Sequence, residues 1–387
     1  MPASDSVMHR HPDHGRMRAP HAKLSSWRVP WRDDTIQTGT IQMLRDLAKP
    51  FFAKPFLARS FLTKALLGGL FAVSAFTAAQ AADKVVFQLD WLPGGDKSPI
   101  YVCIQKGFCK EAGLDVTIEG GRGSSEAITK LATGRSDIGI SGIGALMAAK
   151  ANENVPVKAV MSLFNKGPHA FFVVEGKMAK IADVKGKKVA TSPFTESNIY
   201  LPLVLKDIGL AESDVTLNKV DPGALGPMLM TGATDVIIAW MTDVTRYSNQ
   251  AKQAGKKLTV MPWSDAGLDL YSASLLASDK FLQERPDVAK RFMAAYKKSL
   301  EFARDNKPEA AAAVTAMVPE LNAENVEGQV NDMLPLAFNE VTQRDGLGAL
   351  TPERLKATWA RVAAAQGLNV SKLDPETVVD RRFAPGS

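Results

Sequence analysis

The chain has 387 residues, with 47 Lys and Arg against 41 Asp and Glu, a formal net charge of +6, and two cysteines. The basic excess lies at the start, because residues 1–81 hold 11 of the Lys and Arg and 5 of the Asp and Glu. The remaining 306 residues carry 36 groups of each sign, so they lack the positive field that nucleic-acid binding requires. That length suits one large or two medium domains with a substantial core.

The first residues predict export. Residues 1–42 are polar and lack apolar periodicity, and we interpret them as a disordered extension or a mis-called start. Residues 43–81 combine spaced basic residues, an uncharged run from Ala65 to Ala82 and the small-x-small pattern at 79–81. This combination predicts a cleaved Sec-type signal peptide and a periplasmic protein. The alternative is a membrane anchor, which the Gly, Ser, Thr and Gln in the run disfavour.

Short apolar runs alternate with helical stretches after residue 82, as in α/β proteins. The expected strands are 85–89, 114–119, 137–140, 157–163, 170–174, 187–190, 214–220, 236–239, 258–260 and 272–277. The expected helices between them are 99–106, 124–133, 145–152, 196–208, 223–231 and 243–254. Four further helices with amphipathic spacing are expected at 286–306, 308–317, 323–334 and 352–365.

This order predicts an α/β protein of two lobes, each a mixed sheet flanked by helices, with a helical C-terminal tail. We expect residues 82–168 to form the first part of lobe 1 and residues 169–263 to form lobe 2. Residues 264–387 would return to lobe 1 and supply the tail. The C-terminal ends of the strands would then face a cleft, which is where ligands bind in open α/β sheets.

The two cysteines, Cys103 and Cys109, leave the question of a disulfide open. An oxidising periplasm permits a bridge. On one continuous helix, a separation of six residues would place them on different faces and too far apart. Gly107 would end such a helix between them, so the spacing decides neither way.

Five segments between residues 88 and 303 carry a resemblance to known proteins. They are QLDWLPGGDKSPIYVCIQKGFCKEAGLDV (88–116), GRGSSEAITKLATGRSDIGISGIGAL (121–146), IADVKGKKVATSPFTESNIYLPLVLKDIGL (181–210), LMTGATDVIIAWMTDV (229–244) and FLQERPDVAKRFMAAYKKSLEFA (281–303). The chain resembles the periplasmic solute-binding proteins of sulfonate, nitrate and taurine ABC importers, and most closely their branch for the pyrimidine precursor of thiamine. The resemblance implies a type II periplasmic binding protein fold that closes by a hinge on one small molecule and docks on a membrane permease. We expect a monomer without cofactor or metal.

Asp90 and Trp91 follow the first strand directly, where side chains would face the cleft. An aromatic ring there suits stacking on a flat ligand, and the pyrimidine-precursor branch carries a ligand-contacting Trp in this segment. The alternative is a core Trp with a helix-capping Asp. That branch continues with Asn and His where this chain has Gly-Gly-Asp-Lys at residues 94–97, so the chain departs from the pattern of the branch there. Lys97 and Tyr101 are further candidates.

Two Gly-containing turns of lobe 1 are candidate anion sites. Arg122 and Ser124 lie in the turn 121–125, and Ser141 lies in the next one. Free backbone amides at a helix N-terminus suit a carboxylate, sulfonate or phosphate. An ordinary turn and helix cap explains the same residues equally well.

Lobe 2 offers the segment 191–197 at the matching place. There Phe194 would close over the ligand, and Ser192 and Thr195 would donate hydrogen bonds. Glu196 would accept from an aminopyrimidine edge, although a Glu in the first turn of a helix also stabilises that helix by itself.

The remaining candidates lie at the strand 236–239 and at the crossings between lobes. Trp240 and Asp243 follow that strand, and the resemblance puts Trp240 in the cleft. His169 is the only histidine after residue 81 and lies at the predicted crossover, where a cleft-edge role and plain surface placement are both open. Tyr271 is a weaker candidate.

The sequence therefore predicts a binding protein and not an enzyme. The aromatic candidates favour a heteroaromatic ligand such as a thiamine pyrimidine precursor, and the helix N-termini leave an alkanesulfonate, taurine, nitrate or a carboxylate as alternatives. The rival class is a pyrimidine-synthase-like enzyme of the same fold. The fungal synthases carry a cysteine-rich cluster beside a histidine suited to iron, which two cysteines and one histidine cannot supply. A hydrolase would need a nucleophile elbow, and no GxSxG is present.

Overall fold

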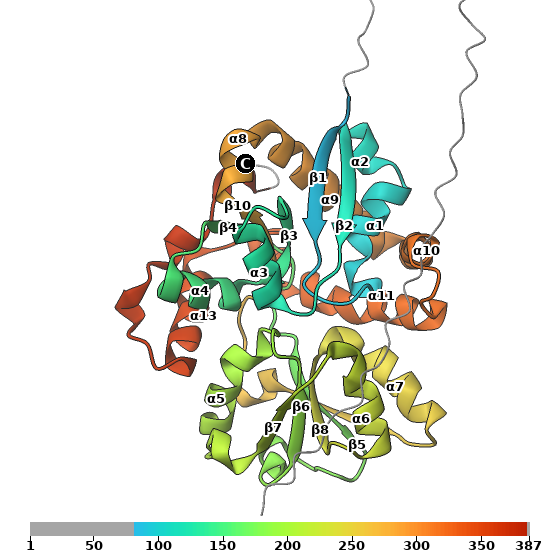
Figure 1. Ribbon diagram of the computed structural model, residues 1–387, viewed down its shortest axis with the longest axis vertical. Coiled ribbons are helices and arrows are strands. Elements are labelled where there is room, and N and C mark those ends of the chain that lie inside the picture. Colours follow the sequence, from blue (N-terminus) through green and yellow to red (C-terminus); the bar gives the residue numbers. More distant parts are fainter. Residues whose placement is uncertain (1–80, 385–387) are drawn as a thin grey trace, which may run out of the picture. The chain divides into compact units, whose positions relative to one another are not determined.

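The computed structural model describes residues 81–384, which form two lobes (Figure 1). The predicted extension (1–42) and signal peptide (43–81) lie outside the described residues, except for Ala81. All ten predicted strands are present, five in each lobe. Within residues 81–384, no helix is both long enough and apolar enough to span a membrane.

The sheet of lobe 1 has the order β2-β1-β3-β10-β4. Its strands are β1 (Asp83–Gln88), β2 (Leu114–Glu119), β3 (Ile138–Gly142), β4 (Val157–Ser162) and β10 (Ala273–Ser278). The first three run parallel, whereas β10 is antiparallel to both β3 and β4 because it enters the sheet on the way back from lobe 2. The sheet is therefore mixed, as expected.

Helices cover both faces of this sheet. They are α1 (Ser98–Gln105), α2 (Phe108–Glu111), α3 (Ser124–Ala132), α4 (Ile143–Glu153), α8 (Asp279–Glu284) and α9 (Pro286–Asp305). The long helix α9 is amphipathic and packs its buried face on the sheet, where Phe292 stacks on Phe87 with ring centres 5.7 Å apart.

Cys103 and Cys109 form a disulfide, with Cα atoms 5.0 Å apart. The chain reaches this geometry because Gly107 adopts φ +80° between α1 and α2, so the cysteines do not share one helix. Both cysteines are buried in the core of lobe 1.

The sheet of lobe 2 repeats the mixed architecture with the order β7-β6-β8-β5-β9. Its strands are β5 (His169–Val174), β6 (Lys188–Thr191), β7 (Thr216–Lys219), β8 (Val236–Trp240) and β9 (Leu258–Pro262). Strand β5 is antiparallel to both β8 and β9. The helices are α5 (Ser197–Asp207), α6 (Leu225–Thr231) and α7 (Val244–Gln253).

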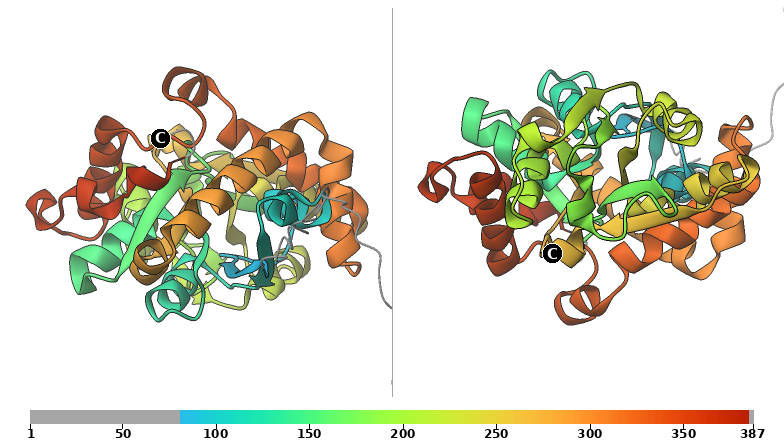
Figure 2. Two further views of the ribbon diagram at one scale, coloured as in Figure 1. Left: turned by 90° about the horizontal axis from the view of Figure 1, so that it is seen from above. Right: turned by 90° about the horizontal axis from the view of Figure 1, so that it is seen from below.

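The C-terminal tail, which the sequence predicted to return to lobe 1, also contacts lobe 2. It contains α10 (Lys307–Met317), α11 (Ala323–Ala337), α12 (Glu340–Asp345) and α13 (Pro352–Ala365), seen in orange to red in Figure 2. Helix α11 joins lobe 2 through Asp332, which accepts a hydrogen bond from the amide of Thr245 at 2.8 Å. Helix α13 does so through Arg361, which pairs with Asp207 of α5 at 2.8 Å.

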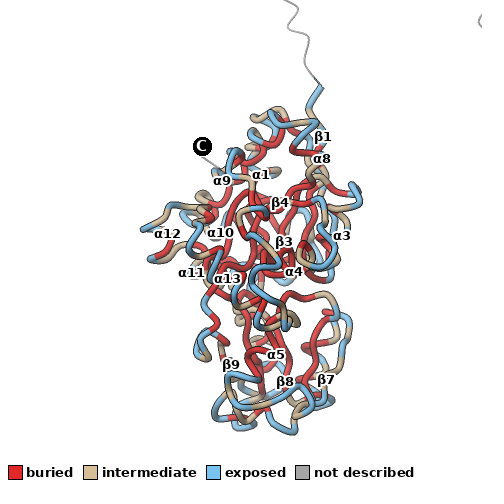
Figure 3. The backbone as a smooth tube through the Cα atoms, turned by 90° about the vertical axis from the view of Figure 1, so that its left-hand side faces the viewer, coloured by how far each residue is buried: buried red, intermediate tan, exposed pale blue. Residues whose placement is uncertain are grey.

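The buried residues follow the strands of both lobes (Figure 3). One hydrophobic cluster lies within lobe 1 and a second within lobe 2. A third cluster continues from α3, α4 and β4 of lobe 1 through the second crossing segment to β5, α5 and α13. The two lobes are thus in apolar contact beside the segments that connect them.

Candidate functional site

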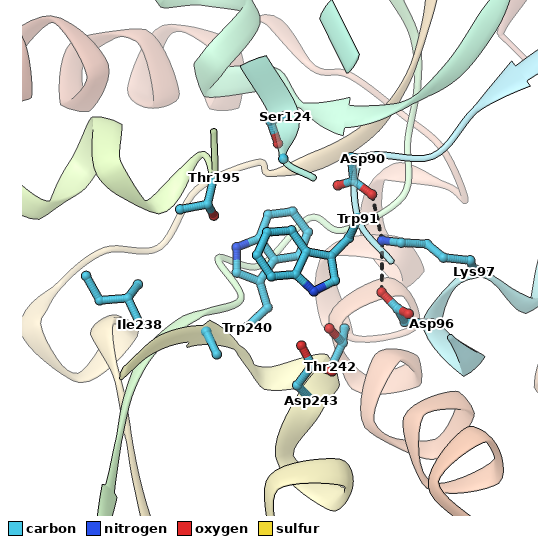
Figure 4. A pocket seen from close by; sticks show the side chains of 12 residues that line it. Asp90, Trp91, Asp96, Lys97, Ser124, Thr195, Ile238, Trp240, Thr242 and Asp243 are labelled. Atoms are coloured by element: carbon cyan, nitrogen blue, oxygen red, sulfur yellow. Dashed lines mark ion pairs between the residues drawn. The ribbon is translucent and has the colours of Figure 1, made fainter. Parts of the chain in front are cut away.

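A pocket lies between the lobes, at the C-terminal ends of β1 and β8 (Figure 4). It holds about 360 Å³ of empty space, part of it open to solvent. Both lobes contribute to its lining, which consists of Asp90, Trp91, Asp96, Lys97, Gly123, Ser124, Thr195, Ile238, Ala239, Trp240, Thr242 and Asp243. Seven of the fifteen predicted site residues are among them: Asp90, Trp91, Lys97, Ser124, Thr195, Trp240 and Asp243.

The lobe 1 wall comes from the turn between β1 and α1. Gly95 of this turn packs directly on the tail, since a Cβ atom added there would stand 1.9 Å from the carbonyl oxygen of Val326 in α11. The Gly95 amide donates to Oε1 of Gln329 at 3.0 Å. This close approach places the following Asp96 and Lys97 against the pocket.

A buried ion cluster forms the charged side of the pocket. Nζ of Lys97 lies 2.7 Å from Oδ1 of Asp90 and 2.9 Å from Oδ2 of Asp96 (Figure 4), and the Lys97 side chain is only 1% exposed. Burial alone would lower the pKa of Lys97, but the two carboxylates outweigh it and raise that pKa, so the lysine stays charged. Burial raises the pKa of Asp96 to about 6, although Lys97 opposes this shift.

The lobe 2 wall starts at the end of β8, where Trp240, Thr242 and Asp243 follow one another. Oδ1 of Asp243 accepts hydrogen bonds from Nε2 of Gln329 at 2.8 Å and from Arg246 at 3.4 Å. Gln329 therefore bonds lobe 2 through its amide nitrogen and lobe 1 through its amide oxygen. Through Gln329, helix α11 of the tail therefore connects the charged walls of the two lobes.

Two indoles form the flat surfaces of the pocket. Trp91 belongs to lobe 1 but packs on the hydrophobic cluster of lobe 2. Its Nε1 is buried without a hydrogen-bond partner in the described residues, and Figure 4 shows this atom on the side of Thr242 and Asp243. Trp240 carries Nζ of Lys97 over its ring at 5.7 Å. A flat molecule between these walls would find a free N–H donor beside them.

Three predicted residues lie where the two lobes touch at the rim, outside the pocket lining. Oγ of Ser192 donates to the carbonyl of Arg122 at 2.8 Å, and the Arg122 guanidinium lies 5.4 Å from the centre of the Phe194 ring. Gly123 makes this contact possible, because its φ is +154° and a Cβ atom there would stand 2.3 Å from the Phe194 carbonyl carbon. These residues bring the lobes together directly.

Ser141, Tyr101 and Tyr271 are buried and lie outside the pocket lining. Oγ of Ser141 donates to the carbonyl of Ser124 at 3.0 Å. Tyr101 lies in the core of lobe 1, where burial raises its pKa to about 12. The hydroxyl of Tyr271 accepts from the Thr351 amide at 3.1 Å, beside the second crossing between lobes.

His169 and Glu196 are both fully buried and also lie outside the pocket lining. Nε2 of His169 stands 3.5 Å from Oε2 of Glu196. Burial lowers the pKa of His169 to about 3, so its imidazole is neutral. Burial raises the pKa of Glu196 to about 7, against hydrogen bonds from Ser272 and the start of α4.

Sequence reasoning missed several residues of the site, above all Asp96, Thr242 and Gln329. Asp96 had a signal, since a charged residue beside Lys97 in a Gly turn at a strand end faces the cleft. Gln329 had none, because it lies 234 residues from Gly95 in a predicted amphipathic helix. Among the described residues, no three His, Cys, Asp or Glu side chains come close enough to hold a metal ion.

The sequence is similar to a known protein family and to several binding proteins. The family model described as NMT1/THI5 like matches residues 95–311, more than half of the chain. The riboflavin-binding protein RibY of Chloroflexus aurantiacus is 24% identical over 324 residues, which cover 81% of this chain and 90% of RibY. The formylaminopyrimidine-binding protein of Halalkalibacterium halodurans is 24% identical over 289 residues, with 73% and 86% covered.

An enzyme and a solved binding protein are also similar. The 4-amino-5-hydroxymethyl-2-methylpyrimidine phosphate synthase THI13 of Saccharomyces cerevisiae is 25% identical over 253 residues, which cover 62% of this chain and 73% of the synthase. The structure of the alkanesulfonate-binding protein SsuA from Xanthomonas axonopodis superposes with a TM-score of 0.61 at 17% identity. The match covers 78% of this chain and 98% of SsuA, and it shows the periplasmic binding protein fold.

Proposed function

The chain belongs to the NMT1/THI5-like family, and from this premise we propose that it is the exported solute-binding component of an ABC importer. Its ligand is a nitrogen heteroaromatic molecule such as a pyrimidine precursor of thiamine. The observation that carries this proposal is the pocket itself, in which two indoles and three carboxylates from both lobes surround one space. The protein works in the periplasm as a monomer and hands its ligand to a membrane permease.

The shape of the pocket supports a flat ligand. Trp91 and Trp240 supply aromatic faces from opposite lobes, so a ring between them gains stacking contacts from both. The free Nε1–H of Trp91 donates to a ring nitrogen or carbonyl oxygen of the ligand. The names of the similar binding proteins, for riboflavin and for formylaminopyrimidine, are consistent with a nitrogen heterocycle.

The charge of the pocket argues against an anionic ligand. Asp90, Asp96 and Asp243 line it, Lys97 is held by the first two, and Arg246 just outside the lining pairs with the third. An alkanesulfonate, nitrate or carboxylate would therefore meet a negative lining without a free cation beside it. Amino groups on a heterocycle would instead donate to the carboxylates, which form stronger hydrogen bonds than neutral acceptors.

Binding requires the lobes to separate and close. The pocket holds about 360 Å³ of empty space, and the polar side chains that line it are buried. Ligand access therefore needs a hinge motion, and we propose that residues 82–168 with 264–384 form one hinged part and residues 169–263 the other. A ligand that contacts both parts stabilises the closed state by its preference for that state.

The buried Ser197, His169 and Glu196 are arranged like a hydrolase triad, with Oγ of Ser197 2.9 Å from Nδ1 of His169. This arrangement does not support hydrolysis, because all three side chains are fully buried and lie outside the pocket lining, where a substrate cannot reach them. Oγ of Ser197 also accepts from Nε1 of Trp240 at 3.3 Å. We therefore assign these residues no catalytic role.

Native mass spectrometry of protein purified without denaturation tests the ligand class, followed by identification of the released molecule. We expect a nitrogen heteroaromatic at one per chain. Titration calorimetry with 4-amino-5-hydroxymethyl-2-methylpyrimidine, riboflavin and taurine then compares the classes. Trp240→Ala and Asp243→Asn should each weaken binding at least tenfold, and the exposed Asp115→Asn should leave it unchanged. Release of an aliphatic sulfonate, or turnover of a bound pyrimidine, would refute the proposal.

A further inference from the structure

Glu196 extends from lobe 2 into a tight seat at the start of helix α4 in lobe 1. Its Oε1 accepts from the amide of Gly144 at 2.8 Å, and its Oε2 accepts from the hydroxyl of Ser272. Gly142 leaves room for the carboxyl group, since a Cβ atom added there would stand 2.1 Å from Cδ of Glu196. The Gly144 amide can donate to Glu196 whether or not the carboxyl group carries a proton, because a carboxyl oxygen accepts in both forms. Lobe 1 is therefore shaped to receive this one side chain of lobe 2.

The same carboxyl group leads to the pocket wall. Nε2 of His169 is buried 3.5 Å from Oε2 of Glu196 and has no hydrogen-bond partner in the described residues. The other ring nitrogen lies 2.9 Å from Oγ of Ser197, which accepts from Nε1 of Trp240 at 3.3 Å. The His169 ring also packs edge-on against the Trp240 indole, with centres 5.7 Å apart. Glu196 is thus linked to the Trp240 indole through His169, both by the direct ring contact and through Ser197.

We propose that Glu196 is a positioning residue, which docks lobe 2 on helix α4 when the lobes close and thereby sets the Trp240 indole through His169 and Ser197. The inference rests on the proposed binding function and assigns a second task to the same movement. Closure then does more than cover the ligand. It also orients one of the two surfaces on which the ligand stacks.

The charged and titratable groups around Glu196 make this contact sensitive to pH. His169 faces it from β5, Tyr200 from α5 and Asp90 from the turn after β1. Burial raises the pKa of Glu196 to about 7, with Asp90 adding to the rise. A protonated Glu196 would bring a donor within 3.5 Å of Nε2 of the neutral His169, which has no other partner among the described residues.

The sign of the pH dependence follows from these shifts. The closed state holds the Glu196 proton up to about pH 7, whereas an exposed glutamate in the open state loses it near its ordinary pKa of 4.5. The closed state therefore binds more protons between these values, so closure is favoured as pH falls and lost as pH rises through 7. Each pH unit in that window changes the closed-to-open ratio by up to about tenfold.

Small-angle X-ray scattering of the mature protein, freed of ligand by unfolding and refolding, measures closure directly between pH 5 and 8.5. We expect the radius of gyration of the wild type to increase as pH rises through 7. Glu196→Gln keeps the shape of the side chain but cannot titrate, so its radius of gyration should stay small and change less with pH. The change that remains near pH 6 comes from Asp96. The control Glu212→Gln alters an exposed glutamate of lobe 2 and should follow the wild type.

Ser197→Ala tests the second half of the inference. It should leave the scattering profile unchanged, reduce the near-ultraviolet circular dichroism of the tryptophans, and weaken binding of 4-amino-5-hydroxymethyl-2-methylpyrimidine about tenfold. A wild-type pH profile in Glu196→Gln, or an unchanged tryptophan signal in Ser197→Ala, would overturn the inference. Absence of pyrimidine binding together with the expected scattering profiles would overturn the assigned ligand class and support the role of Glu196.

Discussion

Replacing Lys97 by methionine tests how the ion cluster is held. Met fills a similar volume but removes the cation that lies 2.7 Å from Asp90 and 2.9 Å from Asp96. Removing one partner of a buried ion pair typically costs about 3 to 5 kcal/mol, because it leaves an uncompensated buried charge. Here two carboxylates lose their partner at once, so we expect the free energy of unfolding to fall by at least about 3 kcal/mol at pH 8.

The matched control is Lys298→Met, which removes an ion pair with Glu111 at 2.9 Å. That pair is 55% and 64% exposed, so its loss should cost at most about 1 kcal/mol. Urea denaturation of ligand-free protein, followed by circular dichroism, measures both. The loss of unfolding free energy caused by Lys97→Met should become smaller toward pH 5. At that pH Asp96, whose pKa is raised to about 6, is protonated and needs no cation. The double variant Lys97→Met, Asp96→Asn should recover part of the loss. Equal losses in the two single variants would refute the reasoning.

Two further predictions concern the packing of lobe 1. Gly95→Ala places a Cβ atom 1.9 Å from a backbone oxygen of α11, so we expect a loss of about 1 to 3 kcal/mol in urea denaturation and weaker ligand binding. Gly120→Ala, which meets nothing within 4 Å, should be neutral, and equal effects of the two substitutions would contradict the close packing of Gly95. Removing the disulfide by Cys103→Ser with Cys109→Ser should lower the stability by about 2 kcal/mol, and a wild-type urea midpoint under non-reducing conditions would show that the bridge is not formed.

Local patterns in the sequence were sufficient for the strands and pointed to part of each pocket wall. The end of the first strand pointed to Asp90 and Trp91 at the cleft, and the family resemblance supported Trp91 and pointed to Trp240. The position of Glu196 was not accessible in this way, since a carboxylate at the start of a helix fits a ligand contact, a helix-dipole contact or a seat in the other lobe equally well. The seat in the other lobe is recognised only from Gly142 and Gly144 across the interface, because a Cβ atom at either position would collide with the Glu196 carboxyl group.

Long-range contacts were the other limit. The disulfide depended on the positive φ of Gly107, which composition does not reveal. The bridging role of Gln329 depended on α11 reaching lobe 2, whereas the amphipathic pattern of that helix indicates a buried face without saying what it packs on.

The strand order of lobe 1 has a consequence for how the chain assembles. Strand β10 lies between β3 and β4, so β4 has no neighbour within the sheet until the chain has passed residue 278. The sheet of lobe 2 is built from the uninterrupted stretch between residues 169 and 262 and needs no later strand. During synthesis, lobe 2 is therefore the first lobe whose sheet can be completed, although the strands β1 to β4 of lobe 1 emerge before it. Until β10 is made, strand β3 of lobe 1 has an unpaired edge. Chaperones shield surfaces of this kind from aggregation.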